Sequence, residues 1–179
     1  MQLVLIYFTV LTAFSSQPEF IFWRADVLQW SHFKTLEKSD DGFDALIATG
    51  IQITTRDSAE HTYIELKSYL EPSESWVQKG SKTAQLLNHE QRHFDITEIS
   101  RRRLSMAIQT TENINAENRS MTIDRLFDNA MQWQSDISDT YDAETNHGLN
   151  MESQERWNNK IDNLLVQYES FSGSTINLW

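Results

Sequence analysis

Hydrophobic and polar residues alternate in the first third of the chain, which is the pattern of β-strands with one buried face. The alternation is clear in Ile51-Gln52-Ile53-Thr54 and again in Tyr63-Ile64-Glu65-Leu66. Both segments belong to a stretch from Phe20 to Leu70 that is rich in β-branched and aromatic residues. Asp40-Asp41-Gly42 interrupts this stretch as a turn. We therefore predict two to four strands in this region.

Helical patterns begin after the break at Glu71-Pro72-Ser73. Gly80-Ser81 supplies an N-cap, which predicts a helix from Lys82 to about Gln109. Near the end of this helix, the Arg101-Arg102-Arg103 triplet is expected to form a solvated face that the helix dipole favours.

Two further helices follow the polar segment that ends at Ser120. Apolar residues recur at helical spacing from Ile123 to Trp133, which predicts a second helix from about Met121 to Ser138. A similar pattern from Trp157 to Tyr168 predicts a third helix, and a loop from Asp139 to Asn150 separates the two. The expected fold is α+β: a small, mainly antiparallel N-terminal sheet packed on about three helices.

The length and composition indicate one globular domain. The chain has 179 residues, 39% of them hydrophobic, with 6 Trp, 9 Phe and 5 Tyr, which is enough for a packed core. The net charge of −11 repels phosphates and argues against a nucleic-acid partner, whereas a cationic substrate segment would be attracted. The absence of cysteine excludes thiolate metal ligands and disulfides.

The N-terminal segment resembles a secretory signal. Residues 1–15 contain no acidic or basic side chain, and the apolar run from Leu3 to Phe14 is too short to span a membrane. Ala13 and Ser15 are the small residues that a cut after Ser15 requires, although no Lys or Arg lies near the start. We expect a signal peptide over residues 1–15, a single domain over residues 16–179 without a membrane span, and a secreted or periplasmic location. A buried strand or an uncleaved anchor is the alternative.

His89-Glu90-Gln91-Arg92-His93 lies within the first predicted helix and has the spacing of a zinc site. Residues four apart on a helix share one face, so His89 and His93 can bind one metal ion together. Glu90 can then act as general base on a water molecule that the metal activates. We expect Zn²⁺ as the cofactor, although imidazole also suits other transition metals.

A catalytic zinc usually takes three protein ligands and leaves one position for water. His147 is the preferred third ligand because it lies in the predicted loop and precedes Gly148, which permits close backbone approach. Asp142 in the same loop is the alternative, and Glu144 is a less favoured one.

Two further residues are candidates for supporting roles. Tyr141 could donate a hydrogen bond to the oxyanion that forms when water attacks a peptide carbonyl, although a packed aromatic ring is an equally good interpretation. Asp95 lies too far round the helix to bind the metal, but it could orient a ligand histidine from outside the metal's immediate shell.

Several segments together resemble a family of predicted secreted zinc-dependent proteases from bacteria, mostly catalogued as a domain of unknown function. The segments that carry this resemblance are Leu28-Gln29-Trp30-Ser31-His32-Phe33, Ser75-Trp76, Leu86 to Ile96, and Tyr141 to Gly148 with Gln154 and Trp157. The resemblance implies metal binding through His89 and His93, catalysis by Glu90, and a role for His147. Arg92 departs from the family pattern, in which a smaller or neutral residue is usual.

We therefore expect a secreted zinc metallopeptidase that hydrolyses a peptide or protein substrate. One alternative is a secreted binding domain in which the metal serves stability only. Another is a zinc amidase that acts on a non-protein amide such as a cell-wall crosslink.

Overall fold

The structure, a computed structural model, describes residues 20–39, 42–58 and 61–178. The expected signal peptide over residues 1–15 lies outside these ranges. Within them, no helix has both the length and the apolar character that crossing a membrane requires.

The larger sheet is built around a long antiparallel hairpin. Its strands are β1 (Ile21–Phe22), β4 (Thr49–Asp57), β5 (Thr62–Leu70) and β7 (Thr175–Asn177). β4 pairs with β5 along its whole length, from Thr49 opposite Leu70 to Asp57 opposite Thr62, and β1 and β7 pair with other parts of β5. Every second residue of β5 is buried. The predicted alternation in Tyr63-Ile64-Glu65-Leu66 is therefore confirmed.

A second, smaller sheet lies beside the start of the first helix. It contains β2 (Lys34–Leu36), β3 (Ala45–Leu46) and β6 (Trp76–Gln78). Its order is β2-β6-β3, in which β6 is parallel to β2 and antiparallel to β3. Strands of two or three residues are too short to show a clear alternation of hydrophobic and polar residues, so the sequence does not predict them. The segments that separate these strands are also too long for a tight turn to indicate which strands pair.

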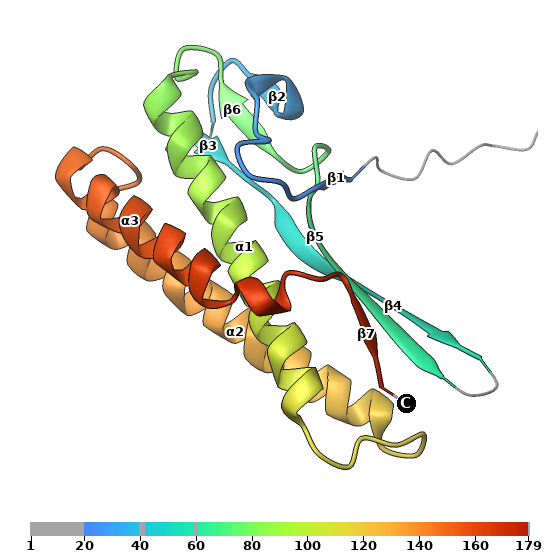
Figure 1. Ribbon diagram of the computed structural model, residues 1–179. Helices are drawn as coiled ribbons and strands as arrows, with labels where there is room; N and C mark the ends of the chain where they lie inside the picture. The colour runs from blue at the N-terminus through green and yellow to red at the C-terminus, as the bar shows by residue number, and fades with distance from the viewer. Residues whose placement is uncertain (1–19, 40–41, 59–60, 179) are drawn as a thin grey trace, which may run out of the picture.

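Three helices complete the α+β fold that was predicted. They are α1 (Ala84–Thr110), α2 (Arg119–Thr145) and α3 (Met151–Gln167), accompanied by the short 3₁₀ helices η1 (Trp30–His32) and η2 (Glu169–Phe171). Figure 1 shows α1 lying between the strands on one side and α2 with α3 on the other.

The helix boundaries differ from the prediction at two places. α1 begins later, because Thr83 rather than Ser81 is the N-cap, and its hydroxyl accepts a hydrogen bond from the Leu86 amide. α2 continues to Thr145, so the first part of the predicted loop is helical. It ends where Asn146 adopts the left-handed conformation with φ of 49°. Tyr141 and Asp142 therefore have helical geometry.

α1 contributes to all three hydrophobic clusters of the core. Leu104 and Ile108 pack with the hairpin and α2, Ile96 and Ile99 with α3, and Phe94 with the segment that leads into the small sheet. A helix buried on several sides holds its side chains rigidly, because each rotamer is fixed by its neighbours.

The arginine triplet of α1 was expected to be solvated, and that prediction is wrong for two of its members. Arg101 and Arg102 are 2% and 4% exposed, and both pair with the buried carboxylate of Glu98. Buried charges need such partners, since an unpaired charge inside a protein is costly.

Candidate metal centre

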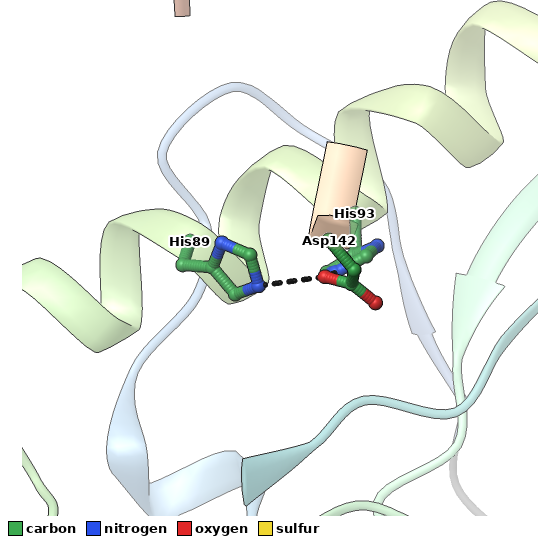
Figure 2. A group of neighbouring side chains, drawn as sticks. All are labelled: His89, His93 and Asp142. Atoms are coloured by element: carbon green, nitrogen blue, oxygen red, sulfur yellow. Dashed lines mark hydrogen bonds and ion pairs between the residues drawn. The ribbon is translucent and has the colours of Figure 1, made fainter. Parts of the chain in front are cut away.

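The two histidines of the α1 motif converge on one carboxylate. His89 Nε2 lies 3.0 Å and His93 Nε2 lies 2.9 Å from Oδ1 of Asp142. Figure 2 shows the three side chains, with the aspartate entering from α2. The ligand atoms of these residues all lie within 4.8 Å of one another, and they form the one such group among the described residues.

The hydrogen bonds of Gln154 indicate which ring nitrogen of His89 carries the proton. The other ring nitrogen, which faces the carboxylate of Asp142, has none. The amide nitrogen of Gln154 donates to Tyr141 Oη and to Asn158 Oδ1, so the amide oxygen is the atom 3.1 Å from His89 Nδ1. That oxygen can only accept, hence His89 Nδ1 carries a proton and Nε2 has a lone pair available. A lone pair and a carboxylate oxygen 3.0 Å apart need a cation between them, either a second proton or a metal ion.

The electrostatics of the group favour a cation. Burial raises the pKa of Asp142, but its close contacts with His89 and His93 outweigh burial and hold the pKa below its ordinary value. Burial lowers the pKa of His93, but its hydrogen bond with Asp142 and the charge of Glu90 outweigh this effect and raise the pKa. Two imidazoles and one carboxylate are also ligands that zinc prefers, so the residues present fit a zinc ion.

An open cleft of about 370 Å³ exposes this group to solvent. Its lining comprises Gly42, Phe43, Asp44, Ala45, Leu46, Ile47, Leu86, His89, Glu90, His93, Asp142, His147 and Leu149. Glu90 is 4% exposed, and burial raises its pKa more than the nearby histidines lower it. No described residue donates a hydrogen bond to the Glu90 carboxylate, which leaves it available to a water molecule in the cleft.

Tyr141 supports the two histidines from behind. It is fully buried, its ring stacks on His89 with centroids 4.6 Å apart, and its hydroxyl donates to the backbone oxygen of His89 at 3.3 Å. Burial raises its pKa far above the ordinary value. Since Tyr141 does not line the cleft, its position favours a packing role over the predicted contact with an oxyanion.

Gln154 takes the orienting role that was predicted for Asp95. The carboxylate of Asp95 accepts hydrogen bonds from Trp23, Gln91 and Arg92, and among the described residues it has no bond to either histidine. The sequence analysis included Gln154 in the last segment that resembles the protease family. It assigned no function to this residue.

The turn that follows α2 is docked directly against His89. Gly148 has φ of +80°, and a Cβ atom there would lie 3.0 Å from Cβ and Cγ of His89. Its amide donates to the Thr145 hydroxyl, and its carbonyl accepts from Gln85 of α1. Glycine is therefore needed for both the conformation and the close approach.

His147 lies beside the group of three rather than within it. Its side chain is 51% exposed, and its Nδ1 lies 3.7 Å from Asp142 Oδ1. Its ring lies against Phe43 with centroids 5.1 Å apart. The structure thus places Asp142, the alternative third ligand, closest to the histidine pair. Glu144 points elsewhere and accepts a hydrogen bond from the Trp157 indole.

Arg92 connects two helices. Its guanidinium donates to Asp95 on α1 and to Asn158 and Asp162 on α3. These bonds account for a long cation at the position where the chain departs from the family pattern.

The fold and site together define an α+β protein with a candidate metal centre of two histidines and one aspartate in an open cleft. Residues 70–148 match the model of a family described as bacterial protein of unknown function (DUF922). The matched segment includes His89, Glu90, His93, Asp142 and His147. No curated protein and no solved structure matches the chain. Because the matched family has no assigned activity, the resemblance to zinc proteases remains a prediction.

Proposed function

We propose that this protein is a zinc-dependent metallopeptidase that hydrolyses peptide bonds. The observation that carries the proposal is the convergence of His89 Nε2, His93 Nε2 and Asp142 Oδ1 in a cleft that Glu90 also lines. A purely structural metal site has no need of an unpaired carboxylate beside its first ligand. Secretion, predicted from residues 1–15, is part of the proposal.

The roles of the residues follow from their positions. His89, His93 and Asp142 would hold the ion, and Gln154 would keep His89 in the tautomer that leaves Nε2 available. When bound, zinc lowers the pKa of water and polarises a carbonyl group. Glu90 would take one proton from the attacking water as its oxygen bonds to the carbonyl carbon. The same carboxyl group would then give that proton to the leaving amine as the C–N bond breaks.

Glu90→Gln tests the proposal. Glutamine keeps the size of the side chain but cannot take the proton, so we expect unchanged zinc content and a loss of activity of about 100-fold or more. Zinc would be measured by elemental analysis of the purified chain from Ser16 onward, and cleavage with a casein-type substrate. His93→Ala should lose both zinc and activity, whereas the exposed Glu152→Gln should lose neither.

The outcomes separate the alternatives. Full activity of the Glu90→Gln protein would refute the mechanism. Stoichiometric zinc in the wild type without cleavage of any protein substrate would favour the non-catalytic domain or an amidase with a non-protein substrate.

A further inference from the structure

Exposed apolar side chains gather at the cleft of the candidate metal centre. Of the seven large hydrophobic residues that are exposed in the described part of the chain, Phe43, Leu46 and Leu149 line this cleft. They are 43%, 40% and 68% exposed, and the partly buried Leu86 adjoins them in the lining. Such a concentration of exposed apolar surface in one cleft is typical of a binding site.

The backbone of the same wall has polar groups without a hydrogen-bond partner among the described residues. In the part of the chain that the structure describes, β3 is an edge strand of its sheet and pairs with β6 alone. The Gln78 amide donates to the Asp44 carbonyl, so in this antiparallel register Asp44 and Leu46 direct their backbone groups toward β6. Ala45 and Ile47 must then direct theirs to the opposite edge, and both residues line the cleft.

A second cavity adjoins the cleft beside the metal centre. This cavity of about 350 Å³ is lined by Ala48, Thr49, Gln134 and neighbouring residues of α2, and it shares Ile47 and His93 with the first cleft. Because the two cavities adjoin at these residues, a ligand longer than the first cleft has a second cavity beside it, which suits an internal segment of a polypeptide better than a chain end.

We propose that the cleft binds an extended polypeptide along the free edge of β3 and selects a large apolar side chain through Leu46 and Leu149. This inference rests on the proposed function for the chemistry at the metal. The backbone of the bound polypeptide supplies hydrogen-bond partners for the N–H and C=O groups of Ala45 and Ile47. Its apolar side chain covers the exposed Leu46 and Leu149. Asp44, Glu90 and Asp142 line the same cleft and disfavour an acidic residue in the bound segment.

Binding to zinc-loaded Glu90→Gln protein tests the inference without requiring cleavage. The probe is a fluorescein-labelled decapeptide of glycine and serine with a lysine at each end and one central leucine. The matched probe has serine at the centre. By fluorescence anisotropy we expect the leucine peptide to bind about 10-fold more tightly, because burial of its side chain is lost in the serine peptide.

The variant Leu46→Ser/Leu149→Ser, made in the Glu90→Gln background, should lose most of this preference. The control Met121→Ser/Val166→Ser changes two residues that are 72% and 75% exposed and line none of the described cavities, and it should keep the preference. Equal affinity for the two peptides, no binding of either, or an equal loss in the control would overturn the inference.

A scan of N-methylated leucine peptides tests the strand pairing. If the peptide pairs with β3 as a strand, only every second peptide amide faces Ala45 and Ile47. Methylation should therefore weaken binding at every second position of the peptide and have little effect at the positions between. A uniform or aperiodic effect would contradict pairing with β3. Cleavage of the unmethylated peptides by the wild type is measured separately, so a failure of the peptidase proposal is distinguishable from a failure of the binding proposal.

Discussion

Asp142 and His147 are the two candidates for the position of third ligand beside His89 and His93, and both line the cleft. Asp142 is fixed on the last turns of α2, with Oδ1 3.0 Å and 2.9 Å from the two ring nitrogens. His147 lies beyond the helix end on a backbone with φ of 51°, and its side chain is half exposed. A ligand held on a helix is more rigidly placed than one on an exposed turn, which favours Asp142.

Zinc affinity of two single variants distinguishes these residues. Asp142→Ala should weaken zinc binding by more than about 100-fold. Loss of a residue that only hydrogen-bonds to a metal ligand typically weakens binding by about 10- to 100-fold, and loss of a ligand itself should have a larger effect. His147→Ala should change the affinity by less than about 10-fold. Competition with a chromophoric chelator measures both values. The reverse order of losses would restore His147 as the third ligand.

Among the elements, α1 is attached to the strands and to the C-terminal segment by a buried cluster of charges. Glu98 accepts hydrogen bonds from Arg101, Arg102 and Ser68 of β5. Arg101 also donates to the backbone oxygens of residues 171–173. The cluster therefore fixes the helix that carries both metal-binding histidines.

Glu98→Gln should lower the free energy of unfolding by about 3 kcal/mol at pH 7, because it leaves the buried Arg101 without a carboxylate partner and leaves Arg102 with the exposed carboxylate of Glu169. Burial raises the pKa of Glu98, but the hydrogen bonds from Arg101 and Arg102 and the charge of Arg101 outweigh burial and hold the pKa below the ordinary value of 4.5. The ionised group therefore stabilises the fold fully above about pH 4.5, and this contribution is lost as the pH falls through the lowered pKa.

Urea unfolding at pH 7 and at lower pH measures this effect. The difference between wild type and Glu98→Gln should shrink as the pH falls below 4.5. Glu152→Gln, which removes an exposed ion pair with Arg156, should cost less than about 0.5 kcal/mol. A difference for Glu98→Gln that is equally small, or that grows in acid, would contradict the assigned role.

At the scale of the whole molecule, the candidate metal centre joins two helices that are far apart in the sequence. His89 and His93 belong to α1, and Asp142 belongs to α2. An ion bound between them would be lost on unfolding, since the three ligands are together only in the folded chain.

Zinc should therefore raise the melting temperature. At a free zinc concentration about 100 times Kd, binding adds about 2.7 kcal/mol, which corresponds to roughly 5–10 °C for a chain of this size. Differential scanning calorimetry with zinc and with a chelator measures the shift. Asp142→Ala should show little shift at the same zinc concentration, and an equal shift in that variant would place the bound ion elsewhere.

The prediction of the site was most successful where spacing within one element was enough. The separation of His89 and His93 by four residues places both on one face of any α-helix, and the structure confirms that helix. The loop predicted after residue 138 was the main error, because α2 continues for about two more turns. Ile137 and Tyr141 continue the apolar spacing of α2, but the polar residues around them obscured it.

The sequence by itself determined the α+β class, the alternation of the two long strands, the three helices, and the helical face that carries His89, Glu90 and His93. These features depend on periodicity and on short-range geometry, which a sequence contains directly. Only the tertiary structure brought Asp142 against the two histidines, placed Gln154 behind His89, buried Arg101 and Arg102, and set the edge of β3 along the cleft. The hydrogen bonds His93–Asp142, His89–Gln154 and Arg101–Gly173 join residues 49, 65 and 72 positions apart. Their formation depends on how helices and sheets pack rather than on any local pattern.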